Sequence, residues 1–380
     1  MTSDASGNVY PTSNQSLLFK VASDGTLVWQ RNVRQSGSPS STPISSYAVA
    51  SLNTGFIAIA GSPSGGTIST GGFLVLLDTN GNFFSTKRFI VGASGSLVGL
   101  TASSAGSLYT SGVLAASSTD LFRVYSGSVT TKKRYSNASY NLNFIGSGAS
   151  DTAYLGAQSS GGPVSISKVD SNLSFIWKVV ATSAYFTRAV ESNGFVYATA
   201  YYGGASALVV KIDANTGSLV WASALTGFPL SVAVDSSDNV YVGGFYGTSK
   251  VGIVFKIDPS GALVWQRSVS IAGLPSYDST RVLNIAVNST NNTICMQVSP
   301  EYNSTAYSIL LSVPTDGTLT GTYTAGGTSV TYGVYSGTFS SPSITFGLAS
   351  ASLGTSTATD SAVTLTATTT TNTYNKVSIP

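Results

Sequence analysis

The segment Phe19-Lys-Val-Ala-Ser-Asp-Gly-Thr-Leu-Val-Trp-Gln-Arg-Asn-Val33 returns near the other end of the chain as Phe255-Lys-Ile-Asp-Pro-Ser-Gly-Ala-Leu-Val-Trp-Gln-Arg-Ser-Val269. Related segments lie between these two. In three of the copies the matched tryptophans, Trp177, Trp221 and Trp265, are separated by 44 residues each time. A regular period of this length indicates that one supersecondary unit is repeated along the chain.

Each repeat has the pattern of four short strands. In the clearest copy the strands are expected at residues 231–235, 240–245, 252–258 and 263–269, which are rich in β-branched and aromatic residues. The turns between them, Asp235-Ser-Ser-Asp-Asn239 and Asp258-Pro-Ser-Gly261, contain the residue types that stabilise tight turns. Counting the copies predicts an all-β protein, a seven-bladed β-propeller of four-stranded blades.

The two ends of the repeat array differ in sequence from the repeats between them. The first unit begins at Asp4 and lacks an innermost strand, so a strand at residues 329–335 is expected to supply it and to close the propeller over residues 1–336. Residues 337–380 are dominated by Thr and Ser. They are interpreted either as an extra outer strand pair packed on the propeller or as an arm that docks onto another subunit.

The composition narrows the class of protein. Charged residues make up 9% of the 380 residues, against about 25% in an average soluble domain. The net charge of +3 is spread thinly, and the small clusters Lys132-Lys133-Arg134 and Lys87-Arg88 are expected at the ends of outer strands, so no nucleic-acid partner is expected. The polar segment after Met1 predicts neither a secretory signal nor a membrane span.

Several kinds of chemistry are disfavoured. The chain has no histidine, which removes Ser-His-Asp catalysis and most zinc sites, and most of its aspartates lie in the repeated turns. We therefore expect a non-enzymatic protein without a cofactor or a metal. The cluster of Asp235, Asp238 and Asn239 has oxygen ligands suited to calcium, but Asx turns explain it without a metal. Cys295 is the only cysteine and is expected in the core.

Loop aromatics provide the candidate binding residues. Tyr201 and Tyr202 in one unit, and Phe245 and Tyr246 in the next, follow the second strand of adjacent repeats, so they are expected on one face. Such residues can stack on sugar rings or contact a protein partner. The alternative interpretation is that they cap the hydrophobic ends of the blades.

The repeat resembles a known family. Val234-Asp-Ser-Ser-Asp-Asn-Val-Tyr-Val-Gly-Gly-Phe-Tyr-Gly247, followed by Val254-Phe-Lys-Ile-Asp-Pro-Ser-Gly-Ala-Leu-Val-Trp265, is similar to the bacterial seven-bladed β-propeller repeat, and the resemblance covers about residues 3–325. It is also similar to the propellers of quinoprotein dehydrogenases and of outer-membrane assembly lipoproteins. The resemblance implies a fold and no particular activity.

Repeats of this family occur in structural proteins of bacteriophage particles and in bacterial surface proteins. The leading hypothesis is therefore a structural component of a virion, in the tail or a surface fibre. It would assemble with other virion proteins, form a homo-oligomer and contact host-surface glycan. The competing hypothesis is an extracellular adhesin or glycan-binding propeller, and a third is a quinoprotein-like enzyme.

Overall fold

The computed structural model of the chain consists of β-strands joined by turns. It describes residues 2–4, 6–12, 17–35, 44–52, 54–63, 72–90, 96–115, 118–126, 128–136, 140–159, 164–181, 184–202, 206–246, 251–274, 278–289, 291–300, 309–325, 327–340, 342, 346–348, 354–355, 359–362 and 365–369. None of these residues forms a helix that is long and apolar enough to cross a membrane.

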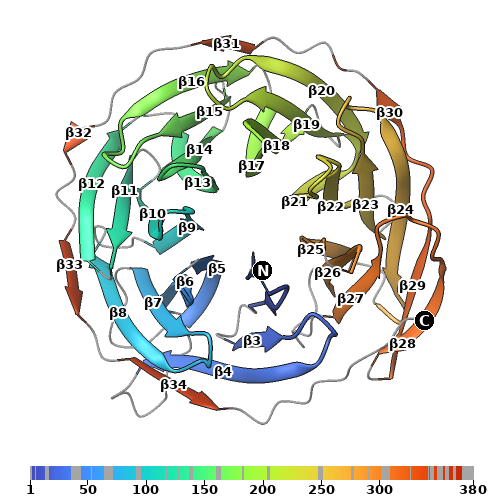
Figure 1. Ribbon diagram of the computed structural model, residues 1–380, viewed down its shortest axis with the longest axis horizontal. Helices are drawn as coiled ribbons and strands as arrows, with labels where there is room; N and C mark the ends of the chain where they lie inside the picture. The colour runs from blue at the N-terminus through green and yellow to red at the C-terminus, as the bar shows by residue number, and fades with distance from the viewer. Residues whose placement is uncertain are drawn as a thin grey trace. The chain divides into compact units, whose positions relative to one another are not determined.

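The strands form seven antiparallel sheets, which are the blades of a β-propeller (Figure 1). This confirms the predicted fold class. The chain divides into two compact units, and most of the first is made of Met1–Ala22, Leu27–Ala181 and Gly347–Thr371. Its four sheets are built in chain order from β1 (Thr2–Ser3), β2 (Val9–Tyr10), β3 (Leu17–Val21), β4 (Leu27–Gln35); β5 (Ile44–Leu52), β6 (Phe56–Pro63), β7 (Gly72–Asp78), β8 (Phe83–Ile90); β9 (Ser96–Ala102), β10 (Ser107–Ala115), β11 (Ser118–Tyr125), β12 (Ser128–Ser136); and β13 (Tyr140–Gly148), β14 (Thr152–Ser159), β15 (Val164–Val169), β16 (Phe175–Ala181).

The second unit is centred on Thr182–Phe346 and contains the other three sheets. In the described residues two of them have four consecutive strands and the last has three. Their strands are β17 (Ala184–Ser192), β18 (Phe195–Tyr202), β19 (Ser206–Asp213), β20 (Leu219–Thr226); β21 (Phe228–Val234), β22 (Val240–Tyr246), β23 (Val251–Ile257), β24 (Leu263–Ile271); and β25 (Thr280–Asn288), β26 (Thr293–Pro300), β27 (Ile309–Pro314).

The repeated tryptophan joins three of the blades to the blade that follows. Trp265 Nε1 donates a hydrogen bond of 3.1 Å to the backbone carbonyl of Thr315, and Lys256 Nζ donates to the same oxygen at 3.2 Å. Gly317 in that turn has a φ of +72°, and a Cβ there would lie 2.7 Å from the Trp265 ring. The same arrangement of Lys, Trp, acceptor and Gly recurs at Lys20, Trp29, Thr79, Gly81 and at Lys211, Trp221, Pro259, Gly261.

These contacts explain why the opening motif is duplicated. A positive φ is available to Gly without steric cost, and only Gly leaves room for the neighbouring indole. The lysine and the tryptophan both donate a hydrogen bond to one turn carbonyl of the next blade, which satisfies this backbone acceptor. The motif is therefore conserved between repeats as an inter-blade clamp.

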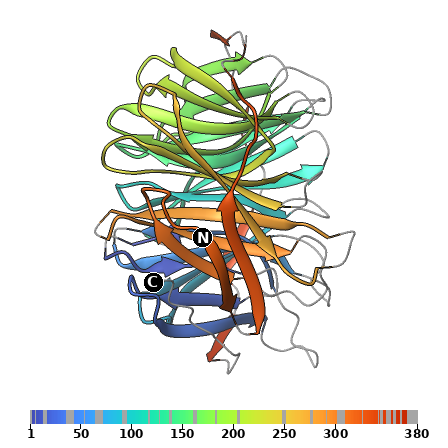
Figure 2. The same ribbon diagram turned by 90° about the vertical axis from the view of Figure 1, so that its right-hand side faces the viewer.

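The chain after β27 runs back along the outer strands. We call the strands β28 (Gly321–Ala325), β29 (Thr328–Val334), β30 (Phe339–Ser340), β31 (Phe346–Leu348), β32 (Gly354–Thr355), β33 (Thr359–Ala362) and β34 (Leu365–Thr369) the outer belt. In the second unit β29 pairs with β24, and β28 pairs with β29, forming the hairpin that faces the viewer in Figure 2. β30 pairs with β20 in the same unit.

The rest of the outer belt follows the sheets of the first unit. β31 extends the sheet of β16, β32 pairs with β12, β33 with β8, and β34 with β4. The outer belt therefore reaches the sheets in the reverse of their order along the chain (Figure 1). Its strands extend the same sheets as the repeats. Of the two interpretations of residues 337–380, the described strands β30 to β34 agree with outer strands packed on the propeller, although they are spread over five sheets and do not form one strand pair.

The predicted closing strand was assigned to the wrong partner. Residues 329–335 were expected as the innermost strand of the first blade, but β29 lies against the outer strand of the sixth, with Val330 opposite Ile271. The first blade is extended instead by β1, which pairs with β2. Val330 and Tyr332 are each only 1% exposed, and burial of this alternating face holds β29 beside β24.

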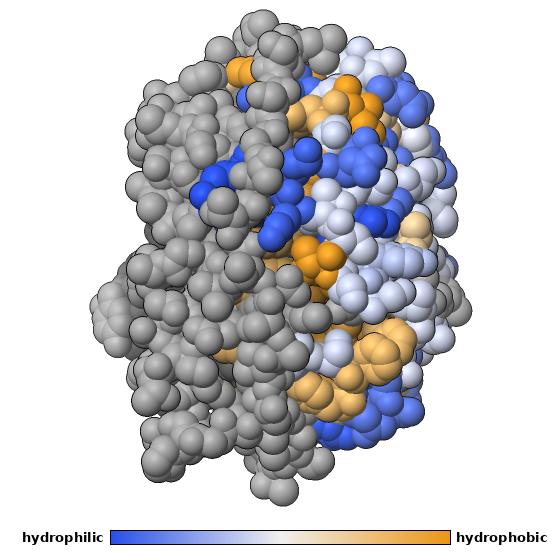
Figure 3. All heavy atoms as spheres, turned by 90° about the vertical axis from the view of Figure 1, so that its left-hand side faces the viewer, coloured by the Kyte–Doolittle hydropathy of each residue, from blue (hydrophilic) through white to orange (hydrophobic). Residues whose placement is uncertain are grey.

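The surface of the described residues reflects the sparse charge of the chain. Figure 3 shows pale polar areas, deeper blue groups and smaller orange areas on one side of the molecule. A surface rich in Ser and Thr offers many hydrogen-bonding groups with little net charge.

Candidate functional site

Three aromatic rings meet in the second unit, and we call them the aromatic cluster. Tyr201 lies at the end of β18, Phe228 at the start of β21 and Phe245 at the end of β22. The Tyr201 and Phe228 rings meet edge to face with centroids 5.6 Å apart, and those of Phe228 and Phe245 are stacked at 5.1 Å. All three side chains are only partly buried, so part of each remains accessible.

Two glycines allow this close approach. A Cβ at Gly244 would lie 2.1 Å from the carbonyl oxygen of Phe228, and one at Gly227 would lie 2.9 Å from that of Phe245. Gly227 also has a φ of +119°, which L side chains rarely adopt. The local sequence thus brings the backbones of β21 and β22 together, so that Phe228 and Phe245 pair directly across the two strands.

Two arginines accompany the rings. The Arg281 guanidinium, from β25, lies 4.2 Å from the centroid of Phe245. Arg188, from β17, is exposed and donates a hydrogen bond of 3.0 Å to the carbonyl of Thr187. Desolvation raises the pKa of Tyr201, while the charges of Arg281 and Arg188 oppose this rise, so both arginines act electrostatically on its hydroxyl.

The surrounding protein also affects Arg188 itself. Desolvation lowers the pKa of its guanidinium, although the residue is exposed to solvent. The two observations are compatible, because solvent can reach a group that protein still surrounds at longer range. Arg188 is thus accessible to a ligand and less well hydrated than a cation in bulk water.

The aromatic cluster lies at one end of its sheets, opposite most of the aspartates. Tyr201 pairs with Tyr185 near the start of β17, whereas the other end of the same strand pair leads into the turn after Ser192. In the next sheet Phe245 is opposite Phe228, and the turn that carries Asp235 is at the far end. Asp278 differs, since this buried carboxylate just precedes β25.

The structure places the described side chains among the four predicted binding residues in different surroundings. Tyr201 and Phe245 do come together, bridged by Phe228, which the prediction missed along with Arg188 and Arg281. Tyr246 instead packs against the buried hydrophobic cluster that includes Val242 and Phe255, so it fits the alternative interpretation as a cap of the blade. The side chain of Tyr202 lies outside the described residues.

The aspartates of the candidate calcium cluster take part in hydrogen bonds. Asp235 accepts from the backbone N–H groups of Ser237 and Asn239 at 2.9 Å and from the Tyr241 hydroxyl at 3.0 Å. Asp238 instead accepts from Ser192 Oγ at 2.9 Å, in the preceding blade. Among the described residues no group of three His, Cys, Asp or Glu side chains is placed to hold a metal ion.

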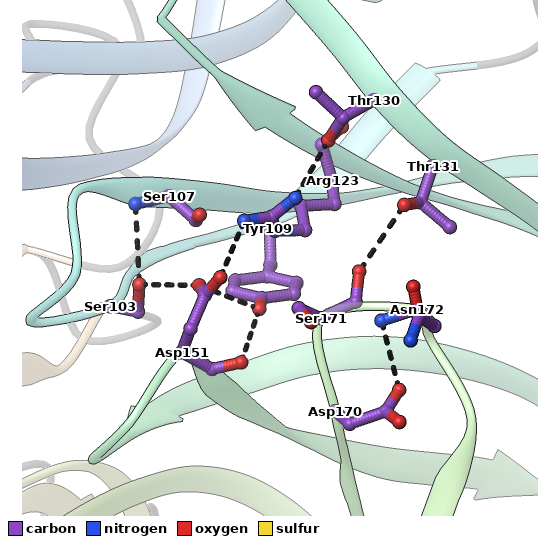
Figure 4. Close-up of polar contacts among 10 residues, drawn as sticks. All are labelled: Ser103, Ser107, Tyr109, Arg123, Thr130, Thr131, Asp151, Asp170, Ser171 and Asn172. Atoms are coloured by element: carbon purple, nitrogen blue, oxygen red, sulfur yellow. Dashed lines mark hydrogen bonds and ion pairs between the residues drawn. The ribbon is translucent and has the colours of Figure 1, made fainter.

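The first unit has a stronger version of this inter-blade contact. Asp151, at a φ of 60°, accepts hydrogen bonds of 2.9 Å from both Ser103 Oγ and the Tyr109 hydroxyl, and it forms an ion pair with Arg123 (Figure 4). Burial desolvates this carboxylate, but hydrogen bonds outweigh that effect and lower its pKa. It stays ionised and joins two blades, and so does not suit a general acid.

No family model matches the chain, and no curated protein matches it. Solved structures do share the fold. A chain of the hydrazine synthase of Kuenenia stuttgartiensis has a TM-score of 0.54 and 10% identity over 80% of this chain and 94% of its own. The GH74 xyloglucanase of Xanthomonas campestris has a TM-score of 0.52 and 11% identity over 83% of this chain and 54% of its own. A chain of a mitotic checkpoint complex has a TM-score of 0.51 and 11% identity, covering 82% and 86%.

These neighbours correct one expectation from the sequence. The absence of histidine and of paired carboxylates led to the prediction that the protein is not an enzyme, yet enzymes are among the structures with this fold. A propeller can hold catalytic groups that no repeat motif reveals, because the fold does not decide the chemistry. At these identities the likeness shows the fold alone.

Proposed function

We propose that this protein is a carbohydrate-binding β-propeller of a bacteriophage particle, in the tail or a surface fibre. The observation that carries the binding function is the aromatic cluster of Tyr201, Phe228 and Phe245. Partly exposed aromatic rings fixed in contact with one another offer flat apolar faces at little entropic cost, and these suit the apolar faces of sugar rings. A tyrosine hydroxyl adds a hydrogen-bonding group at the same place.

The setting in a virion is supported by the repeat pattern. We assign the chain to the bacterial seven-bladed repeat family, because the motif of residues 234–265 is similar to it and seven sheets follow from the repeats. In this setting the propeller is a rigid platform that assembles with other virion proteins and with copies of itself. The aromatic cluster then contacts glycan on the host surface.

The binding function is tested on a glycan array followed by titration of the best ligand. Tyr201→Ala and Phe245→Ala should each weaken binding by about tenfold, because stacking on an aromatic face is lost. Tyr246→Ala is the matched control, since it removes a neighbouring aromatic side chain that packs elsewhere. Failure to bind any carbohydrate, or an equal loss in the control at unchanged melting temperature, would refute the function.

The virion setting has a test of its own. Mass spectrometry of purified particles from the source should detect this protein at a constant ratio to the major structural proteins. Absence from the particles would favour the second candidate, an extracellular or cell-surface adhesin, which the aromatic cluster supports equally well. A secretion signal in the full reading frame would favour the adhesin too.

A further inference from the structure

Positive charge accompanies the aromatic cluster at one end of the second unit. Arg281 lies over Phe245, and Arg188 is paired opposite Thr199, which is two residues before Tyr201 on the same strand. These side chains come from β17, β18, β22 and β25, and hence from three sheets of the same unit. A neutral sugar would need no pair of cations beside the surface on which it stacks.

The acidic residues of this unit are mostly elsewhere. Asp213 is paired opposite Phe195, at the far end of the strand that carries Tyr201. Asp235 and Asp238 also lie in a turn at the far end of their sheet from Phe245. The buried Asp278, whose carboxylate accepts a hydrogen bond of 2.8 Å from the N–H of Ser279, is the acidic residue nearest in sequence to Arg281. Among the described residues, most carboxylates of this unit thus lie at the other end of its sheets from the two arginines.

The position of Arg281 over the Phe245 ring suits the binding of a carboxylate. A guanidinium that lies over an aromatic face directs its N–H donors along its own plane, and this planar fork matches the two oxygens of a carboxylate. Arg188 is exposed, so a ligand can reach its guanidinium, and desolvation by the surrounding protein lowers its pKa. A cation in this state gains more from an anionic ligand than a fully hydrated one does.

We infer that the aromatic cluster with Arg188 and Arg281 is a binding site for acidic carbohydrate, a pyranose that carries a carboxylate, as uronic and sialic acids do. The pyranose would contact the exposed parts of the aromatic rings, and its carboxylate would accept hydrogen bonds from the two guanidinium groups. This inference rests on the carbohydrate-binding function proposed above and specifies its ligand class.

Matched ligands separate the charge from the sugar ring. The full chain is titrated with oligogalacturonate and its methyl ester, and with sialyllactose and lactose. At least one acidic ligand should bind about tenfold or more tightly than its neutral counterpart, because a hydrogen bond to a charged group is stronger than a neutral one. This preference should shrink as salt is added.

Variants then assign the preference to the two arginines. Arg188→Gln and Arg281→Gln should each reduce the preference for the acidic ligand by about tenfold. Arg281→Lys should have an intermediate effect, because it keeps the charge and loses the planar fork. Lys132→Gln on β12 is the control for the loss of one positive charge and should change nothing. Melting temperatures identify any variant that fails to fold.

The outcomes distinguish this inference from the proposed function. Equal binding of acidic and neutral partners would overturn the inference and leave carbohydrate binding intact. An acidic preference unchanged in both Gln variants would also overturn it, since other residues would then bind the carboxylate of the ligand. If no ligand of either pair binds and the glycan array is negative too, both proposals fail together.

Discussion

At the scale of single residues, the same side chain type serves both turns and contacts between blades. The first aspartate of a turn, such as Asp235, accepts hydrogen bonds from its own turn, whereas Asp151 and Asp238 reach the preceding blade. The latter two share a left-handed conformation, at φ of 60° and 61°. Asp tolerates this region better than most residues, which explains its use there.

Asp151 should give the protein a pH-dependent stability. Its pKa is lowered in the folded state from 3.8, so its contribution is present above about pH 4 and is lost as the pH falls through the folded value. We expect Asp151→Asn to lower the free energy of unfolding by about 1–3 kcal/mol at pH 7 and by less near pH 3, measured by urea denaturation at both pH values.

The control for this prediction is Asp316→Asn. Asp316 accepts hydrogen bonds of 3.0 and 2.9 Å from the backbone N–H and the hydroxyl of Thr318, within one exposed turn, and asparagine can accept the same bonds. Its effect should be smaller at pH 7 than that of Asp151→Asn. A loss in Asp151→Asn that is equal at both pH values would show that the ionised carboxylate is not the source.

At the scale of elements, the outer belt changes the edges of the sheets. A propeller blade ends in an outer strand whose N–H and C=O groups can pair with another chain. Here β4, β8, β12, β16, β20 and β24 each have a further strand on their outer side. Several of the added strands have only two to four residues, and such short edges are poor templates for association.

Truncation should show both contributions of the outer belt. A chain ending at Tyr335 keeps β28 and β29 but exposes the edges of five outer strands, so it should self-associate with increasing concentration in light scattering. A chain ending at Thr320 also loses the buried side chains of Val330 and Tyr332, and its free energy of unfolding should fall by about 3 kcal/mol or more in addition.

A substitution on the same strand provides the control. Val334 is 71% exposed, so Val334→Ala should leave the stability unchanged, whereas Val330→Ala should lower it. If the chain ending at Tyr335 keeps the oligomeric state and the melting temperature of the full chain, the belt does not protect the edges.

At the scale of the whole molecule, the contacts that recur between blades and the candidate binding site use different residues. Blade order and inter-blade contacts follow from the repeated motif, since Trp29, Trp221 and Trp265 each donate to a turn carbonyl of the following blade. The candidate site uses residues that differ between repeats. A site built in this way can change its ligand without loss of the fold, because the clamp residues and the binding residues are different.

Much of this protein was predictable from the repeat alone. Strands, tight turns, the seven blades and the need for Gly and Trp at fixed positions are local properties that alternation and turn chemistry specify. The pairing of β29 with β24 was not predictable, because an alternating strand fits an inner or an outer edge equally well.

The binding site, too, could be predicted only in part from the sequence. Tyr201 and Phe245 could be placed on one face from their equivalent positions in adjacent repeats, but Phe228 and Arg281 have no shared motif to mark them. Only the tertiary structure brings these residues together, since the stacking of rings and guanidinium depends on how three sheets of the second unit pack. The sequence thus determined the architecture of each blade, and packing between blades decided the edge pairing and the chemistry of the site.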